Sequence, residues 1–357
     1  MDIANLRLSS QHIAQADFKT AHDVVAWMGA MQAQDYNGAL WAIALRTPNL
    51  TKDDVEKAIA ERQIVRTWPM RGTLHFLAAE DARWITQLLA PRALAAATSR
   101  RKQLAIDDAV LAAARDVIVR ALEGGKCLTR NDLLSRLDDA GIATAEQRGS
   151  HLLYHWAAMT LICFGPHEGK QPTFVLMDEW LPPTPERTRE EALKELATRY
   201  FKSHGPASLR DFAGWGKLTV KDARLGIELA GTALASQEEN GTVYWFDPAV
   251  EPAAPATYLL PGFDEYMLGY KDRTAALALE HTNRIVPGNN GMFLPTLVNN
   301  GQVVATWKKT VRSKSQTILI TSLEAPSDVQ LASVAPALKR YEAYSGLPTS
   351  CELASTN

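Results

Sequence analysis

Apolar residues recur at helical spacing through most of the first 250 positions and give way to short β-rich runs after that point. Because residues three and four apart share one face of a helix, this pattern predicts a mainly helical first part. The segments expected to be helical are 21–31, 38–46, 108–122, 146–159 and 186–203, with further helices opening after Thr51 and at Thr219.

One arrangement of helices followed by an extended pair recurs about every 80 residues. Residues 64–77 alternate around a break at 69–72, and residues 161–177 turn at 165–169, as β-hairpins do. Thr129 and Ser208 stand at the same point of their repeats, each as an N-cap before a short helix. Three helices followed by a hairpin are the plan of a winged helix-turn-helix, so the sequence predicts three such units in tandem.

Proline clusters at 182–185 and 248–255 are typical of linkers. After the second cluster, β-rich runs at 257–260, 302–307 and 317–321 are separated by glycine and asparagine turns. They predict a small β-sheet or barrel from about 256 to 322, closed by a helix over 329–344.

The predicted fold class is therefore α+β, with three tandem winged helix-turn-helix units and a small C-terminal β-barrel. The expected boundaries are 1–100, 101–182 and 183–250 for the three winged helices, and 251–357 for the barrel with its closing helix.

Composition places the chain among ordinary globular proteins, since 46% of its residues are apolar and 22% are charged. No run approaches the roughly 18 apolar residues of a membrane helix, and the N-terminus lacks the plan of a secretion signal. Three cysteines, Cys127, Cys163 and Cys351, cannot form a disulfide framework and suit a reducing compartment. A cytoplasmic, nucleoid-associated protein without a membrane partner is expected.

The charge balance excludes a protein that binds polyanions through bulk charge, because 38 basic and 40 acidic residues give a net charge of −2. A local basic groove is compatible with that balance. Basic residues cluster over 92–102, over 308–314 and at Arg62, Arg66 and Arg71. Any one such run is more often a solvated face than a binding site.

Common catalytic motifs for nucleotide hydrolysis, serine hydrolysis and dinucleotide binding are missing from the sequence. The best metal candidate is His151 with His155, one helical turn apart, followed by Cys163 and His167. The apolar neighbours of the two histidines favour a core-facing helix instead, so we predict no metal and no other cofactor. Asp264 and Glu265 are adjacent, which makes a glycosidase-type carboxylate pair a poor interpretation.

The segment 31–38 (MQAQDYNG) places two amides, Gln32 and Gln34, on either side of one small residue. On a straight helix, residues two apart point in nearly opposite directions, so both amides can address one site only where the helix ends or unwinds. The residues Asp35 to Gly38 are a plausible place for that. Taken alone, two glutamines near a helix end are most often surface or capping residues.

Four segments together resemble the AlkZ-like bacterial DNA glycosylases of the winged-helix DNA-binding superfamily. They are residues 31–36 (MQAQDY), 66–75 (RTWPMRGTLH), 260–273 (LPGFDEYMLGYKDR) and 285–291 (IVPGNNG). The resemblance covers essentially the whole chain and implies three winged helices and a β-barrel in a C-shape around duplex DNA.

The family's catalytic signature, Gln-x-Gln or Gln-x-Asp, falls on Gln32 and Gln34, so this chain sides with the Gln-x-Gln branch. The resemblance implies a monofunctional DNA glycosylase that hydrolyses the N-glycosidic bond of N7-alkylated guanine and unhooks interstrand crosslinks. The motif then lies in the first winged helix, and Asp35 directly after it leaves open whether a carboxylate assists.

The expected partner is double-stranded DNA carrying alkylated guanine, bound by a monomer because three tandem units can cover a duplex. Phosphate contacts should supply most of the affinity. Besides Asp35, the residues expected to contact DNA are Trp68, Arg71, His75, Arg100, Arg101, Lys102, Lys308, Lys309, Arg312 and Lys314. For Trp68 and His75, a buried wing tryptophan and a structural histidine are equally compatible with the sequence. The block 263–273 fits core packing and an internal salt bridge better than catalysis.

Two other functions fit the same fold. A transcription regulator should prefer one sequence over random duplex by ~10³-fold or more, whereas a repair enzyme should not. A protein-interaction scaffold should show no salt-dependent binding to DNA.

Overall fold

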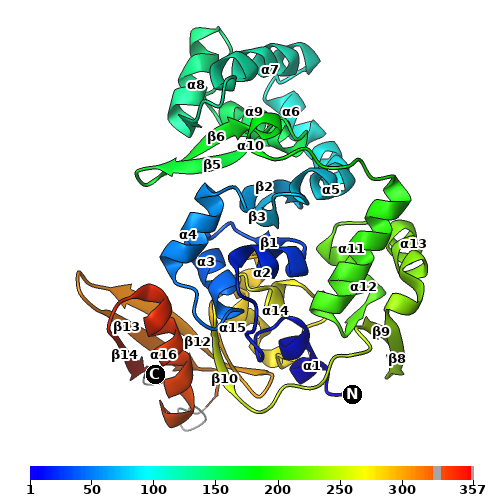
Figure 1. Ribbon diagram of the computed structural model, residues 1–357, viewed down its shortest axis with the longest axis vertical. Coiled ribbons are helices and arrows are strands. Elements are labelled where there is room, and N and C mark those ends of the chain that lie inside the picture. The colour runs from blue at the N-terminus through cyan, green and yellow to red at the C-terminus, as the bar shows by residue number, and fades with distance from the viewer. Residues whose placement is uncertain (325–330, 355–357) are drawn as a thin grey trace. The chain divides into compact units, whose positions relative to one another are not determined.

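The computed structural model describes residues 1–324 and 331–354. The chain divides into two compact units (Figure 1). The first unit contains residues 1–56 and 194–357, and the second contains residues 57–193. Within the described residues, no helix is long and apolar enough to cross a membrane.

The first unit has a mixed composition of helices and short strands. Its elements are α1 (Ile3–Ser10), α2 (Ala21–Met28), β1 (Met31–Gln32), α3 (Tyr36–Leu45), β7 (Ala207–Ser208), α12 (Leu209–Trp215), α13 (Val220–Ala230), β8 (Ala235–Glu239), β9 (Thr242–Phe246), β10 (Thr257–Leu260), α14 (Glu265–Leu268), α15 (Thr282–Ile285), β11 (Thr296–Asn299), β12 (Gln302–Val311), β13 (Gln316–Ser322), α16 (Leu331–Ser345) and β14 (Thr349–Leu353).

The second unit is built in the same way from helices and hairpins. Its elements are β2 (Ile64–Met70), β3 (Thr73–Ala78), α5 (Ala82–Ala96), α6 (Thr98–Gln103), α7 (Asp108–Leu122), β4 (Leu128–Thr129), α8 (Arg130–Asp139), α9 (Arg148–Ala158), β5 (Ile162–Glu168), β6 (Gln171–Leu176) and α10 (Met177–Trp180). The chain passes between the two units within α4 (Lys52–Ala60) and α11 (Arg189–His204).

One order of elements occurs in both units. In the second unit, α7, β4, α8, α9, β5 and β6 follow one another, and the sheet order is β4-β6-β5. In the first unit, α11, β7, α12, α13, β8 and β9 repeat that sequence with the sheet order β7-β9-β8. The predicted N-caps are confirmed, since the side chains of Thr129, Ser208 and Thr219 each accept a backbone N–H three residues on. The fold class is a mixed α+β fold, as predicted.

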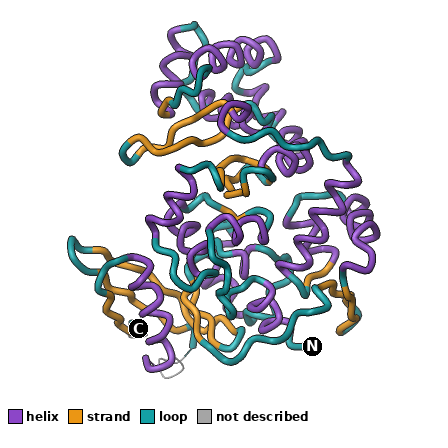
Figure 2. The backbone as a smooth tube through the Cα atoms, in the orientation of Figure 1, coloured by secondary structure: helices purple, strands orange, loops and turns teal. Residues whose placement is uncertain are grey.

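The core of the second unit lies between its helices and its strands (Figure 2). Leu111, Ile118 and Leu122 of α7, at helical spacing, are buried with Leu152 of α9 and Phe174 of β6. The predicted helix over 108–122 is confirmed to the residue. An amphipathic helix of this kind is stable because its apolar face is buried against a sheet.

The predicted hairpin over 64–77 is confirmed as β2 and β3, joined by a tight turn. Arg71 and Gly72 form the turn and both have positive φ, 57° and 74°. Two successive residues in this region give a turn whose twist suits a hairpin. The pairing shifts between Thr67 and Met70, which accommodates Pro69 because proline cannot donate to the ladder.

The C-terminal β-barrel is not found, and this prediction is wrong. The strands form a five-stranded sheet in the order β10-β11-β12-β13-β14, whose two edge strands are not paired with each other in the described part of the chain. A barrel requires that pairing. Instead, α16 packs against the sheet (Figure 1) and supplies the core that closure would otherwise provide. Tyr341 of α16 packs against Trp307 of β12. The expected closing helix at 329–344 corresponds to α16, and residues 329 and 330 lie outside the described residues.

Candidate active site

The Gln-x-Gln motif lies between two helices, on a short non-helical segment. The expected helix over 21–31 is shorter than predicted, because α2 ends at Met28 and Gly29 follows with φ 74°. Glycine adopts this left-handed conformation without a side-chain clash, which makes it a common helix terminator. The expectation that residues 35–38 end a helix is also wrong, since Asp35 is the N-cap of α3.

The two amides differ in exposure. The Gln32 side chain is 8% exposed, whereas Gln34 is exposed to solvent. Met31 and Ala33 are buried as well, β1 contains only Met31 and Gln32, and Gln34 lies in a bend before α3. The motif therefore does not lie on a straight helix, where residues two apart would point in nearly opposite directions.

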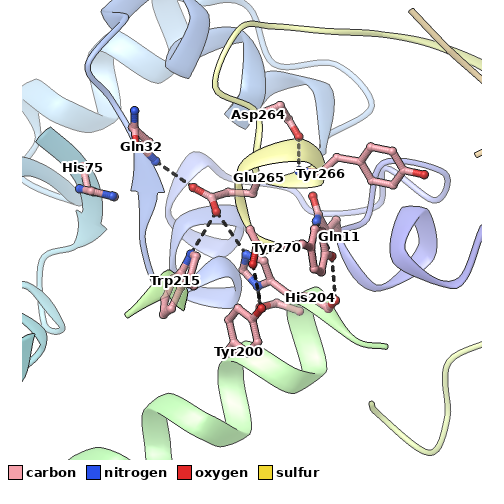
Figure 3. A network of polar contacts seen from close by, with 12 residues as sticks. Gln11, Gln32, His75, Tyr200, His204, Trp215, Asp264, Glu265, Tyr266 and Tyr270 are labelled. Carbon is pink, nitrogen blue, oxygen red and sulfur yellow. Dashed lines mark hydrogen bonds and ion pairs between the residues drawn. The ribbon is translucent and has the colours of Figure 1, made fainter. Parts of the chain in front are cut away.

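A buried carboxylate fixes the main chain of the motif. Glu265, the first residue of α14, is 1% exposed, and its Oε1 accepts the backbone N–H of Gln32 at 3.1 Å. Its Oε2 accepts the indole N–H of Trp215 at 3.0 Å, and His204 Nε2 lies 3.5 Å from the same oxygen (Figure 3). Figure 3 shows the Gln32 side chain extending away from the carboxylate. The carboxylate of Glu265 therefore contacts the motif at the backbone of Gln32.

The carboxylate of Asp264, which precedes Glu265 in the sequence, forms a buried ion pair with Arg46. The two oxygens of Asp264 accept from the two terminal nitrogens of Arg46, each at 3.0 Å, and both side chains are fully buried. Arg46 also donates to Gln11, which in turn donates to the Tyr270 hydroxyl. The predicted internal salt bridge of the 263–273 block is confirmed. The charge of Asp264 is satisfied locally, because a bidentate arginine pair is the strongest of the common ion pairs.

Burial sets the protonation of the groups around Glu265. It lowers the pKa of His204 below its ordinary value of 6.5, although the nearby Glu265 acts in the opposite direction. His204 is then neutral at pH 7, and its ring stacks on Tyr200 with a centroid distance of 4.7 Å. Burial also raises the pKa of Tyr270 above its ordinary range, so this hydroxyl donates to the backbone carbonyl of His204.

Asp35 follows the motif as a helix cap at the edge of a cavity. Its side chain accepts the N–H of Gly38 at 3.1 Å, which satisfies one of the free amides at the start of α3. Asp35 is exposed and lines a cavity of about 460 Å³ together with residues of β12 and α16. All the residues lining this cavity belong to the first unit.

The predicted DNA contacts of the first unit gather on the β12–β13 hairpin. Lys308 and Lys309 are on β12, and Arg312 and Lys314 are in the turn, where Arg312 N–H donates to Ser315 at 2.8 Å. All four basic residues are exposed. Lys309 Nζ donates to the Tyr341 hydroxyl at 3.0 Å. These side chains are accessible to a phosphate backbone.

The predicted contacts on the β2–β3 hairpin are held inside the second unit. Trp68 is half-buried against Phe164 and Phe174, with ring centroids 5.1 Å and 6.4 Å away. His75 is fully buried, with Nε2 2.9 Å from Arg71 and Nδ1 3.0 Å from the Thr73 carbonyl. Because arginine only donates, Nε2 accepts and Nδ1 carries the proton. Both ring nitrogens of His75 are therefore paired within the hairpin.

The remaining predicted contacts lie on α6. Arg100 and Lys102 are exposed, and Arg101 is half-buried and donates to the Leu94 carbonyl. Burial and then the charge of Arg101 lower the pKa of His155 on α9 to about 4. Burial, and then the charges of Arg100 and Arg101, also lower the pKa of His151.

No group of three or more His, Cys, Asp or Glu side chains that could hold a metal ion occurs in residues 1–324 and 331–354. Cys163, which the sequence places after the His151 and His155 pair, is completely buried, and burial raises the pKa of its thiol. It is a core residue of β5.

Glu265, Trp215 and His204 were not among the site residues expected from the sequence. Glu265 lies in the 260–273 block, where it was assigned to packing. Its partners are 50 and 61 positions away, and His204 and Trp215 carry no local motif. An acid directly after an N-cap aspartate, in a block otherwise rich in apolar residues, is the only sequence signal that marks this position.

Comparisons with known proteins identify the family. Residues 25–344 match the model of the family described as DNA glycosylase AlkZ-like. The chain is 28% identical over 325 residues to an interstrand DNA cross-link repair glycosylase of Streptomyces sahachiroi, covering 85% of each protein. The solved structure of Streptomyces sahachiroi DNA glycosylase AlkZ superposes with a TM-score of 0.83 and 23% identity, over 99% of this chain and 98% of that one.

The family model covers most of the chain, including the Gln-x-Gln segment and the Glu265 that holds it. The chain therefore belongs to the AlkZ-like family and is a DNA glycosylase.

Proposed function

We propose that this enzyme hydrolyses the N-glycosidic bond of N7-alkylated guanine in duplex DNA and unhooks interstrand crosslinks formed at that position. Gln32 and Gln34 are the catalytic pair. The observation that carries the assignment is the placement of both glutamines on one non-helical segment whose main chain Glu265 fixes. The crosslink activity rests on the relative of 28% identity, which is an interstrand cross-link repair glycosylase.

The chemistry suits neutral side chains. Alkylation at N7 puts a positive charge on guanine, which weakens the glycosidic bond and makes the base a good leaving group without a strong acid. The remaining tasks are to orient a water molecule and to stabilise the cationic sugar. A glutamine carbonyl accepts a hydrogen bond from the water and directs its dipole toward the cation.

In this assignment, Glu265 acts on the catalytic pair indirectly, through the backbone of Gln32. Its Oε1 holds the Gln32 main chain, and His204 next to it is kept neutral by burial. The two oxygens of Glu265 accept from the Gln32 backbone and the Trp215 indole, so the motif is held in position before the substrate binds. Groups that are preorganised in this way cost no rearrangement during the reaction.

A crosslinked guanine stays tethered to the opposite strand, so complete extrusion into a deep pocket is geometrically difficult. We therefore infer that the active site is open and not a deep pocket. The repeated helix-and-hairpin arrangement acts as three winged helices that bind DNA as a monomer. The basic groups on the β12–β13 hairpin and on α6 contact phosphates. The C-shaped placement of these parts around a duplex stays a prediction.

The test uses duplex DNA with one N7-methylguanine and a second duplex with a nitrogen-mustard crosslink. After incubation, alkaline cleavage reveals abasic sites. The wild-type enzyme should release the base from both, whereas the double variant Gln32→Ala, Gln34→Ala should release neither.

The double variant should retain DNA affinity within about threefold, because neutral amides contribute little to phosphate binding. Asn299→Ala, at an amide on β11 outside the motif, controls for the loss of a glutamine-like side chain. Base release by the double variant at the wild-type rate would defeat the catalytic assignment. Binding that prefers one undamaged sequence by ~10³-fold would favour a regulator instead.

A further inference from the structure

The cavity beside the motif is much larger than a methyl substituent needs. Its volume is about 460 Å³, within the roughly 300–1,000 Å³ of sites that hold drug-sized ligands. Its lining includes Asp35, the residue that directly follows Gln34, and Gly262, three residues before Glu265. Chain neighbours of the proposed catalytic pair and of Glu265 thus line the cavity.

Aromatic rings form the walls of the cavity. Trp41, Trp307 and Tyr341 line it and are themselves almost completely buried. The Trp41 and Tyr341 centroids lie 5.0 Å apart, and those of Trp307 and Tyr341 lie 5.4 Å apart. Pro261 and Pro295 add further flat apolar surface. Walls of this kind fit a flat apolar group and stabilise it by excluding water.

The rim of the cavity is polar on one side. Pairing of β11 with β12 begins at Thr296 with Thr306, and Trp307 N–H donates to Pro295. From Lys308 onward, the described ladder pairs β12 only with β13. Lys308 and Lys309 both line the cavity at this strand edge, and Lys309 is oriented by the Tyr341 hydroxyl. Cationic donors here suit oxygen acceptors on the edge of a ligand.

We propose that this cavity holds the substituent carried on guanine N7, and that it suits a flat aromatic or polycyclic adduct with oxygen acceptors on its edge. The inference rests on the proposed function. N7 and N9 belong to the same five-membered ring, so a substituent on N7 starts close to the glycosidic bond that the two glutamines address. The cavity then selects bulky adducts in addition to the positive charge that all N7 adducts share.

Two duplexes of identical sequence test this assignment, one with N7-methylguanine and one with the aflatoxin B1 adduct at guanine N7, a flat polycycle that carries carbonyl oxygens. Single-turnover base release is measured for both. The cavity is filled by Thr321→Trp, and by Thr306→Trp at its cross-strand neighbour, because both threonines line the cavity. Thr310→Trp is the matched control on β12, exposed and outside the cavity.

The wild-type enzyme should release both bases. Each filling variant should slow release of the aflatoxin adduct about thirtyfold and leave release of N7-methylguanine within about twofold, because only the bulky group loses its place. Thr310→Trp should leave the ratio of the two rates unchanged. Thermal denaturation establishes that the variants are folded.

Equal slowing of both substrates would mean that the cavity holds the guanine base itself and would overturn the assignment. Rates unchanged by either filling variant would overturn it as well. A wild-type enzyme that releases N7-methylguanine but not the aflatoxin adduct would defeat the cavity assignment alone. One that releases no N7-methylguanine would defeat the proposed function.

Discussion

The β2–β3 and β12–β13 hairpins both carry an arginine in their turns, yet their side chains have different surroundings. On β2–β3, Arg71 contacts His75 and Trp68 packs on two phenylalanines of the same unit. On β12–β13, Arg312 and Lys314 are exposed and have no side-chain hydrogen bond or ion pair within the described residues. A polar side chain that is already satisfied has little to gain from a ligand, whereas an exposed cation gains from each phosphate that it meets. The first hairpin should therefore stabilise the fold, and the second should bind DNA.

The largest expected effect that tests this contrast is the loss of Trp68. Trp68→Ala removes a half-buried indole between Phe164 and Phe174 and should lower the free energy of unfolding of the second unit by about 3 kcal/mol. Chemical denaturation measures this loss. DNA affinity of the folded variant should stay within about twofold of wild type.

Lys308→Ala, at an exposed position on the other hairpin, is the opposite control and should leave stability unchanged. If Trp68→Ala stays fully folded and loses more than about tenfold in DNA affinity, Trp68 contacts DNA and the contrast between the hairpins fails.

A buried group can still serve the reaction, and Glu265 tests that possibility. Glu265→Gln keeps the shape of the side chain but removes its charge and one of its two acceptor positions, toward Gln32 or Trp215. A hydrogen bond to a charged group contributes about 1.5–3 kcal/mol, so base release should slow by about tenfold or more. The dissociation constant for DNA should not change, since the carboxylate is buried.

The same substitution at an exposed glutamate, Glu238→Gln on β8, is the matched control and should leave both constants unchanged. Loss of DNA affinity in Glu265→Gln without slower base release would show that Glu265 supports the DNA-binding surface and not the motif.

The exposed hairpin should show a smaller and salt-dependent effect. Arg312→Ala and Lys314→Ala should each weaken DNA binding several-fold, equally for damaged and undamaged duplex. Each removed phosphate contact should reduce the slope of log K against log salt by about 0.9. Titrations at three salt concentrations measure the slope. An unchanged slope in the double variant would place the hairpin away from the phosphates.

Local signals in the sequence account for most of the elements described above. Thr129, Ser208 and Thr219 predict helix starts because a hydroxyl cap acts within three residues of its own position. The turn at Arg71 and Gly72 is equally local. Such features need no knowledge of distant contacts.

Distant pairings explain what the sequence did not predict. The barrel was predicted wrongly because β14 joins the sheet parallel to β13 only after α16 has intervened, and its residues 349–353 have no strong β pattern. The role of Glu265 depends on Gln32, 233 positions away, and on Trp215 and His204. The helix limits around the motif were missed because α2 ends before Gly29 and residues 31 and 32 form β1, which their apolar neighbours do not signal.

The smallest expected effect is a loss of stability at acidic pH. His155 of α9 lies in the second unit, where α9 contacts β2, and burial lowers its pKa from 6.5 to about 4. The unfolded chain therefore binds a proton more readily than the folded unit, so stability that is complete above pH 6.5 is lost as the pH falls toward 4. Between pH 7.5 and 5, the midpoint of thermal unfolding of wild type should fall about 2 °C further than that of His155→Gln, which cannot take up this proton.

The comparison between the two proteins cancels the effect of the carboxylates that titrate in both. DNA binding through β12–β13 should not depend on this residue. An equal acid shift in both proteins would mean that His155 titrates in the folded unit as it does in the unfolded chain, and that the β2–β3 region is less tightly packed than its contacts indicate.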